Sequence, residues 1–463
     1  MSIFNSNLSS EQILSVLKDV QSSIHFIGIL GSGMYPLARL LGERGYKISG
    51  SDDAAREGIY QDAGGITVTR PDRCLDKDID MVVYSLAIDE ENPQIQSAKS
   101  RGVMLVSRAQ LLGALMSLYD VRVSVSGSHG KSTVTALIDH ILASSGNAHT
   151  TVCGAKLSTG ESFLDEGGRI ILAEACEYKD SFLRLCPTHQ LITSVELDHT
   201  DYFESIDRIM ASFLCAARKA EYILVNVDDT NAAVIADKIR SEKRNTLLTY
   251  GRNETADYRI CDIKRKGDKT DFTVLSEGRK FNLTTSLIGV FNLYNITAAV
   301  AMSDMLGIDK YEIEKATASF RPIDRRMTLI SEINDVPVYY DYAHHPSEIH
   351  ALVDALKERY GTVTLIFRPH TYSRTQSLWQ GFIDELGRAD FTVLLDIYPA
   401  REKPIDGISS QRLASFIKNA VYSDKSDAVE LALSHRSDVI ALVGAGEVED
   451  IKRKLIELGK NTG

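Results

Sequence analysis

Cysteine is scarce in this sequence of 463 residues, and its six cysteines include no C-x-x-C pair. Their scattered spacing indicates neither a disulfide framework nor a zinc module, and a reducing cytoplasm fits it best. The first 21 residues lack the basic start and the apolar stretch of a secretory signal. No run approaches the roughly 20 apolar residues that span a bilayer. We therefore expect a protein that is neither exported nor inserted in a membrane. The cysteines are Cys74, Cys153, Cys176, Cys186, Cys215 and Cys261.

Positive charge is also in short supply. Lys and Arg number 52 against 63 Asp and Glu, a formal net charge of −11, which disfavours general attraction to nucleic acid or anionic lipid. An anionic ligand would have to be held by a local site. With only 10 prolines, 44% hydrophobic and 25% charged residues, collagen-like and broadly disordered chains are excluded. The chain is about three times the roughly 150-residue size of one domain, so two or three domains are expected.

Short apolar strands alternate with helical periodicity through most of the chain, which predicts α/β domains with parallel sheets. Between residues 258 and 288 the pattern changes to short alternating segments with turn residues, which predicts an antiparallel flap. We place the domains at 1–120, 121–322 and 323–463. The principal strands are predicted at 24–27, 121–125, 169–173, 191–195, 222–227, 338–340, 363–367, 392–396 and 439–443.

The strongest motif is Gly-Ser-His-Gly-Lys-Ser at 127–132, between a predicted strand and a predicted helix. Glycines let backbone N–H groups surround a phosphate at a helix N-terminus. Lys131 would add a positive charge against the β- and γ-phosphates, and the Ser132 hydroxyl can bind Mg²⁺. The segment predicts an ATP site, although Val125 stands where the common phosphate-binding motif has its first glycine. The structural alternative is an ordinary glycine turn before a helix.

Two further predicted strands end in residues that can bind a metal ion. Glu174 follows one strand and His199 follows another. Ligands collect at the carboxyl ends of strands in open parallel sheets, so Ser132, Glu174 and His199 are expected to converge around Mg²⁺. Taken singly, Glu174 and His199 would more often be solvated loop residues or make structural hydrogen bonds, and only their joint placement favours a metal site.

Taken in order, these motifs resemble those of the Mur ligase family of ATP-dependent amide-forming enzymes, and the resemblance covers nearly the whole chain. It implies an α/β fold of three domains. The N-terminal domain would be Rossmann-like and bind a UDP-sugar. The central domain would be P-loop ATPase-like, with a parallel sheet and an antiparallel flap, and the C-terminal domain would be Rossmann-like and bring in an amino acid. The matching segments are 28–34, 127–133, 174–182, 198–202, 292–295, 325–326, 341–346 and 368–375.

The resemblance implies a reaction in peptidoglycan precursor synthesis. ATP would phosphorylate the lactyl carboxylate of UDP-N-acetylmuramate, and the amine of L-alanine would attack the acyl phosphate and expel phosphate. ATP and Mg²⁺ are the implied cofactors, and UDP-N-acetylmuramate and L-alanine the implied partners. The location would be cytoplasmic, and the sequence does not decide between a monomer and a homodimer.

The resemblance also implies roles for individual residues. It assigns catalysis to Lys131, Glu174, His199 and His345. It assigns ATP binding to Gly127, Ser128, His129, Gly130, Lys131, Ser132, Thr133, Asn292, Asn295, Arg326 and Asp341. It assigns the UDP-sugar to Gly28, Gly31, Gly33, Met34 and Asp52, the amino acid to His345, His370 and Arg374, and the metal to Ser132, Glu174 and His199. The general base stays open among His344, His345 and His370. The structural alternative is histidines that cap a helix and an arginine on a solvated face.

Two other enzymes fit parts of the sequence. A murein tripeptide recycling ligase would use the same UDP-sugar and ATP chemistry, but its third-domain pocket would have to admit a peptide. An NAD-dependent oxidoreductase is suggested by Asp52, which stands where a Rossmann acid would touch a ribose. The oxidoreductase leaves the segment 127–132 unexplained.

Overall fold

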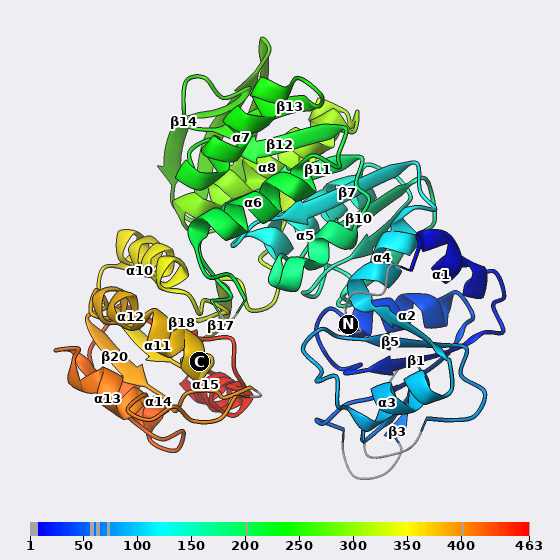
Figure 1. Cartoon of the computed structure of the whole chain (residues 1–463). Helices are drawn as coiled ribbons and strands as arrows, with labels where there is room; N and C mark the ends of the chain where they lie inside the picture. The colour runs from blue at the N-terminus through cyan, green and yellow to red at the C-terminus, as the bar shows by residue number, and fades with distance from the viewer. Residues whose placement is uncertain are drawn as a thin grey trace.

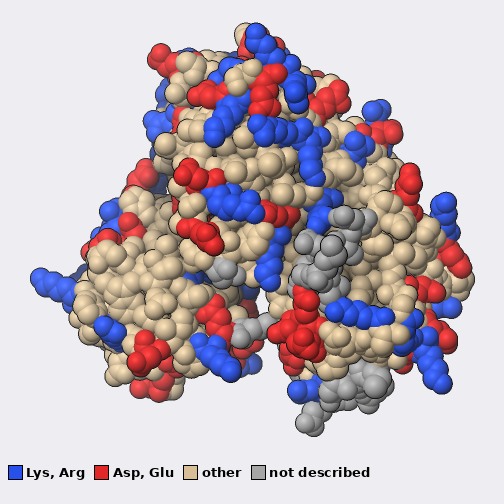
Figure 2. Space-filling view, viewed as in Figure 1, with Lys and Arg blue, Asp and Glu red and all other residues tan. Residues whose placement is uncertain are grey.

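The computed structural model describes residues 8–55, 60–61, 65–71, 75–200, 202–400 and 402–462. Cys74 and Asp201 lie outside the described residues. Figure 1 shows three bodies, each built on its own sheet, with the N-terminal domain in blue and the C-terminal domain in yellow to red, both below the central domain. The predicted three-domain α/β fold is confirmed. On the face drawn in Figure 2, acidic and basic side chains are interspersed.

The N-terminal sheet has six strands in the order β3-β4-β2-β1-β5-β6, and only β3 runs antiparallel to its neighbour. Every residue of β5 is buried, as expected for a parallel strand covered on both faces. The strands are β1 (Ser23–Ile27), β2 (Lys47–Ser51), β3 (Tyr60–Gln61), β4 (Thr67–Thr69), β5 (Met81–Tyr84) and β6 (Met104–Ser107). The helices are α1 (Ser10–Val16), α2 (Tyr35–Glu43), α3 (Pro93–Ser100) and α4 (Arg108–Met116).

The central sheet has ten strands in the order β16-β15-β14-β13-β12-β11-β7-β10-β8-β9. The predicted antiparallel flap is confirmed, because β14, β15 and β16 pair antiparallel and extend the parallel sheet. The strands are β7 (Val121–Ser126), β8 (His149–Val152), β9 (Phe163–Asp165), β10 (Ile170–Glu174), β11 (His189–Ile192), β12 (Tyr222–Asn226), β13 (Thr246–Gly251), β14 (Tyr258–Lys266), β15 (Lys269–Ser276) and β16 (Arg279–Thr285). The helices are α5 (Lys131–Ser144), the 3₁₀ segment η2 (Tyr178–Arg184), α6 (Ile206–Ala217), α7 (Thr230–Glu242), α8 (Val290–Met305) and α9 (Lys310–Ser319).

The strand predicted at 191–195 is wrong at its C-terminal end, because β11 stops at Ile192. The Thr193 N–H still donates to the carbonyl of Ser126 in β7 at 3.0 Å, but the Thr193 hydroxyl and the Ser194 carbonyl bond the loop after β7. Ser128 donates its backbone N–H to the Ser194 carbonyl at 2.9 Å, and Thr193 donates its hydroxyl to the His129 carbonyl.

The C-terminal sheet has six strands in the order β17-β18-β22-β19-β20-β21, with β17 antiparallel to β18. β19 and β22 are buried along their whole length. The strands are β17 (Thr328–Ile333), β18 (Val336–Asp341), β19 (Val363–Phe367), β20 (Phe391–Leu394), β21 (Ala420–Tyr422) and β22 (Val439–Val443). The helices are α10 (Pro346–Tyr360), α11 (Tyr372–Ser377), α12 (Trp379–Leu386), α13 (Ser410–Ser415), α14 (Ala428–Ser434) and α15 (Glu449–Thr462).

The N-terminal and central domains meet in a close contact. Helix α4 approaches η2 so closely that a Cβ atom on Gly113 would lie 2.2 Å from the carbonyl oxygen of Arg184. Beside this contact, Arg44 at the end of α2 donates to both carboxylate oxygens of Asp165 in β9, at 2.7 and 2.9 Å. In the part of the chain that the structure describes, no helix is long and apolar enough to cross a membrane.

Replacement of Arg44 by Met should lower the free energy of unfolding by about 1–3 kcal/mol, because Asp165 loses a charged hydrogen-bond donor at a site only 15% exposed. The measurement is the urea midpoint of the first unfolding transition. Arg240→Met is the matched control, since the Arg240 and Asp237 side chains are 57% and 75% exposed; its effect should stay within about 0.5 kcal/mol. Equal shifts in the two variants would contradict the assigned role of Arg44.

Candidate active site

The loop between β7 and α5 is shaped by close packing against the segment after β11. A Cβ atom on Gly127 would lie 1.9 Å from the Thr193 hydroxyl oxygen, and one on Gly130 would lie 2.5 Å from the side-chain oxygen of Asn295. Both glycines also have positive φ values, 141° and 82°, which other residues adopt with strain. Gly130 is the N-cap of α5, so the positive end of the helix dipole faces the loop.

Lys131, the first residue of α5, turns its ammonium group back over the loop. Nζ donates to the carboxylate of Glu177 at 3.0 and 3.2 Å and to the carbonyl oxygens of Gly127 and Ser128. Glu177 is 1% exposed. Burial opposes the charged form, but the carboxylate outweighs it and raises the pKa of Lys131. The loop therefore carries a permanent positive charge, neutralised by Glu177.

Ser132 and Glu174, two of the three predicted metal ligands, are in contact. The Ser132 hydroxyl donates to Glu174 Oε2 at 3.0 Å, and the same oxygen accepts the Gly154 backbone N–H at 2.9 Å. A hydroxyl and a carboxylate are the hard oxygen donors that Mg²⁺ prefers, so this pair fits the ion. The third predicted ligand, His199, lies next to Glu177, with its Nε2 at 3.9 Å from Glu177 Oε1.

A cavity of about 270 Å³ opens beside the loop, between α8 and the C-terminal domain. Asn295 donates to the side-chain oxygen of Asn292 at 3.1 Å, and both face the cavity from buried positions on α8. Tyr250 and Phe291 supply flat apolar walls, which suit a planar base. Seven of the residues predicted to bind ATP line this cavity, and they are His129, Gly130, Thr133, Asn292, Asn295, Arg326 and Asp341. The remaining four, Gly127, Ser128, Lys131 and Ser132, lie in the loop and the first turn of α5.

Asp341, the last residue of β18, has a structural task at the edge of the cavity. Its two oxygens accept the backbone N–H groups of Met327 and Ala343, both at 2.7 Å. Burial raises the pKa of Asp341 to about 6, against the pull of nearby Arg326. The side chain thus orders the segment that carries Arg326 to the cavity.

The glycine loop after β1 forms a tight turn under a second, smaller cavity of about 240 Å³. Gly31 donates its N–H to the Gly28 carbonyl at 3.2 Å. Gly33 lines the cavity and packs against Arg108, and Glu174 lies on the opposite wall. Met34 is buried in the core of the domain. This cavity therefore lies between the N-terminal loop and Glu174.

Asp52 holds the glycine loop in place. Its Oδ2 accepts the N–H of Leu30 and its Oδ1 that of Ala54, each at 3.0 Å. Asp52 therefore has a structural role, in which it links the glycine loop to the turn after β2. Asp52 also lines a third cavity, described next.

A cleft of about 780 Å³ is lined by residues of all three domains, and the opening between the two lower domains is visible in Figure 2. On its C-terminal side Arg374 donates to both oxygens of Asp198, at 2.9 and 3.2 Å, and to His370 Nδ1 at 3.0 Å. Burial lowers the pKa of His370 to about 3 and that of His344 to about 4. Both imidazoles are therefore neutral at pH 7 beside a paired guanidinium.

His345 does not join His370 and Arg374, with which it was grouped in the sequence analysis. It is the N-cap of α10, where Nδ1 lies 2.8 Å from the Ser347 hydroxyl, so the structural alternative of a helix-capping histidine describes its position. Its ring packs 5.3 Å from that of His129 in the loop after β7. The predicted amino-acid residues are thus divided between two places.

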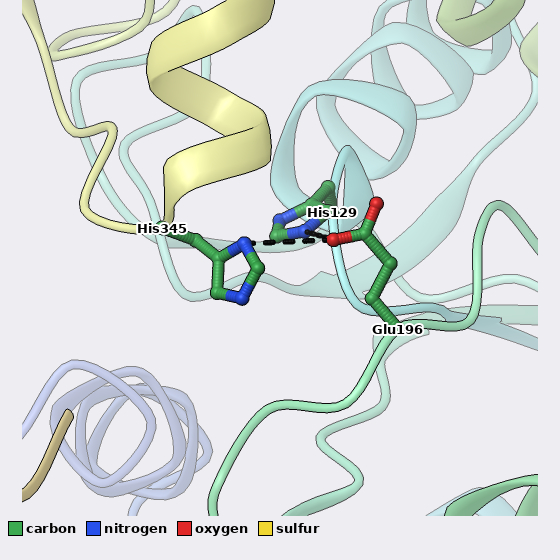
Figure 3. A group of neighbouring side chains, drawn as sticks. All are labelled: His129, Glu196 and His345. Carbon is green, nitrogen blue, oxygen red and sulfur yellow. Dashed lines mark hydrogen bonds and ion pairs between the residues drawn. The ribbon is translucent and has the colours of Figure 1, made fainter. Parts of the chain in front are cut away.

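Figure 3 shows His129, Glu196 and His345 facing one another across the domain boundary. His129 Nε2 lies 3.2 Å from Glu196 Oε2, and His129 Nδ1 lies 2.9 Å from Glu348 Oε1. Burial opposes a charge here, but Glu348 and Glu196 outweigh it and raise the pKa of His129 to about 10. At neutral pH the ring is an imidazolium held between two carboxylates.

Sequence reasoning missed the acidic partners of the loop. Glu177 and Glu196 each follow a predicted strand by a few residues, the same signal that marked Glu174. Glu348 stands three residues after the helix cap, the position of a capping-box glutamate. These signals were present, but nothing in the local sequence indicates that the three side chains reach the same loop.

Three family models match the chain in succession. Their descriptions are Mur ligase family, catalytic domain (residues 23–120), Mur ligase middle domain (residues 125–303) and Mur ligase, glutamate ligase domain (residues 325–446). Among curated proteins, the UDP-N-acetylmuramate–L-alanine ligase of Aquifex aeolicus is 34% identical, over 94% of this chain and 97% of that protein. The enzyme of the same name from Thermobifida fusca is 36% identical, over 95% of this chain and 97% of that protein.

Solved structures show the same fold. The UDP-N-acetylmuramate-alanine ligase of Thermotoga maritima superposes with a TM-score of 0.78 at 23% identity, covering 95% of this chain and 100% of that one. A murein peptide ligase from Psychrobacter arcticus superposes with a TM-score of 0.67 at 21% identity, covering 95% and 99%. At these identities the likeness concerns the fold alone.

Proposed function

The chain belongs to the Mur ligase family, and on this premise we propose that it joins L-alanine to the lactyl carboxylate of UDP-N-acetylmuramate, with ATP converted to ADP and phosphate. The observation that carries the proposal is a set of three cavities that adjoin the loop 127–130, the first turn of α5 or the acids that contact them. His129 borders the first, Glu174 the second and His199 the third. Three reactants require three sites around one reacting centre.

In this proposal the central domain holds ATP. Asn292 and Asn295 face the base, since amide groups can both donate and accept at its edge. The N–H groups of the loop 127–130 and the ammonium of Lys131 hold the phosphates. Ser132 and Glu174 would hold Mg²⁺, with His199 beside Glu177, and the ion would neutralise charge on the phosphates.

The reaction then needs positioning more than covalent help from the protein. The lactyl carboxylate oxygen attacks the γ-phosphorus, and ADP leaves. The alanine nitrogen attacks the resulting acyl carbon, and phosphate leaves as the amide bond forms. A UDP-sugar held over the loop 28–34 would place its acid in the cavity that contains Glu174.

The amino acid is placed in the cleft beside Arg374. Its carboxylate would replace Asp198 as the bidentate partner of the guanidinium. Neutral His344 donates from Nδ1 to the Tyr342 carbonyl, so its Nε2 can accept a hydrogen bond from the amine without repelling it. A second candidate, addition of a murein tripeptide, is favoured by the size of the cleft, about 780 Å³, which exceeds what alanine fills.

Phosphate release should require ATP, Mg²⁺, UDP-N-acetylmuramate and an amino acid together. L-Alanine should give the highest kcat/KM among alanine, glycine, serine and the murein tripeptide, each supplied in turn. A higher value with the tripeptide would favour the recycling ligase. Release that does not depend on the amino acid would reject the ligase assignment.

Replacement of Lys131 by Ala should lower phosphate release by about 100-fold or more, because the transferred phosphoryl group loses its charged contact. Binding of UDP-N-acetylmuramate, measured by calorimetry, should be nearly unchanged. Lys238→Ala on the exposed face of α7 is the control and should retain full activity. Unchanged turnover in the Lys131 variant would remove the assignment of the phosphate site.

Replacement of Arg374 by Ala should raise the KM for L-alanine at least tenfold and leave the KM for ATP within about twofold, since a charged bidentate contact is lost on one substrate only. Initial-rate kinetics with each substrate varied will separate the two constants. Arg388→Ala removes a more exposed guanidinium, 41% exposed, from the same domain and serves as the control. Equal rises for both substrates would contradict the role given to Arg374.

A further inference from the structure

Helix α10 of the C-terminal domain is held by the central domain at both ends. At its C-terminal end Arg359 donates to Asp268 at 2.7 Å, and Arg265 donates to the Glu358 carbonyl at 3.0 Å; Asp268 and Arg265 belong to the β14–β15 hairpin. At its N-terminal end the helix meets the loop after β7 through Glu348. Only the second contact touches the proposed nucleotide site.

Glu348 divides its two carboxylate oxygens between two tasks. Oε2 accepts the backbone N–H groups of His344 and His345, at 2.9 and 3.3 Å, and so caps α10. Oε1 lies 2.9 Å from His129 Nδ1 in the loop. The cap needs only an acceptor, whereas the contact with His129 joins two opposite charges across the domain boundary.

The surroundings of His129 require it to donate from both ring nitrogens. Nδ1 faces Glu348, and Nε2 faces Glu196 Oε2 at 3.2 Å and the Ser347 hydroxyl at 3.2 Å. Ser347 already donates its single proton to Glu196 at 2.7 Å. A proton on each nitrogen of His129 satisfies both carboxylates.

One further charged group, Arg326, and two further titratable histidines also face this cluster. Arg326 and His344 lie toward Glu348, and His345 Nδ1 lies 3.5 Å from Glu196 Oε2. Nitrogen and oxygen atoms of His129, Glu196 and His345 lie within 4.8 Å of one another, a spacing that a metal ion can also bridge. A protonated His129 explains its own contacts without a metal ion.

We propose that Glu348 is a positioning residue that ties the shape of the phosphate loop to the docking of the C-terminal domain. With α10 in place, Glu348 fixes the charged His129, and with it the backbone N–H groups that are to hold the phosphates. When the domain departs, His129 keeps Glu196 alone and the loop loses an anchor. The catalytic role of this contact rests on the proposed function, but the contact itself can be tested without the ligase reaction.

The decisive variant is Glu348→Gln. A glutamine carbonyl still caps α10, as glutamine does in capping boxes, but its NH₂ group cannot accept the proton of His129. The control is Asp268→Asn, which removes the ion pair at the other end of the same helix. His129→Gln removes the proposed contact from the loop side, and the double variant with Glu348→Gln closes a thermodynamic cycle.

The affinity for MgADP should fall about tenfold in Glu348→Gln, and the KM for ATP should rise by a similar factor. Calorimetry should find UDP-N-acetylmuramate binding unchanged. Asp268→Asn should retain wild-type nucleotide affinity. The affinity of the double variant His129→Gln, Glu348→Gln should be no lower than that of the weaker-binding single variant. Wild-type affinity in Glu348→Gln, or an equal loss in Asp268→Asn, would overturn the proposal.

A second readout is the titration of His129 followed by NMR. The pKa of His129 is raised to about 10 by the two carboxylates, so its charge is present at neutral pH and lost as the pH rises through that value. Glu348→Gln removes one of the two carboxylates, so it should lower the pKa of His129 toward neutral pH. Asp268→Asn should leave the pKa of His129 unchanged. An unmoved titration in Glu348→Gln would overturn the proposal. If MgADP affinity and titration change as expected while no amino acid supports phosphate release, the contact stands and the ligase assignment fails.

Discussion

The organisation of the molecule depends on keeping buried positive charges next to one loop. Lys131 and His129 are both largely withdrawn from water, and a buried charge is costly unless it is paired and hydrogen-bonded. Lys131 is paired with Glu177, and His129 with Glu196 and Glu348. These acids come from the segment after β10, the segment after β11 and the first turn of α10. The loop can therefore keep this form only where all three segments meet.

The same constraint links the domains. Glu348 belongs to the C-terminal domain, so its contact with His129 stabilises a closed arrangement, and the pairing of Arg374 with Asp198 adds a second ion pair across the boundary. The second pair occupies the guanidinium that we assign to the amino acid. A substrate carboxylate must therefore displace Asp198, and the released aspartate would need a new partner. Under that assignment, substrate binding and domain position would be coupled through this exchange.

The sequence predicted the elements that are coded locally. The strand, glycine loop and helix around residues 127–142 follow from apolar residues, two glycines and the Lys-Ser pair, and the antiparallel flap follows from alternating residues and turns. The end of β11 was missed because Thr193 and Ser194 serve the loop after β7, a tertiary use that strand propensity does not register. Glu348 was missed because its partner lies 219 residues away along the chain. His345 was grouped with His370 and Arg374 because of its motif, but its position as the N-cap of α10 places its ring beside His129 instead.

The balance of charges around the loop affects how strongly a nucleotide can bind there. Glu174, Glu177, Glu196 and Glu348 supply four carboxylates, while Lys131, His129 and Arg326 supply three positive charges. A triphosphate brought into this surplus of negative charge would be repelled unless further cations came with it. Ser132 and Glu174 offer oxygen ligands for a divalent ion at the point where the phosphates would lie. Under the proposed function, the acids that hold the loop in shape would therefore make nucleotide binding depend on a divalent cation from solution as well as on the cations of the protein.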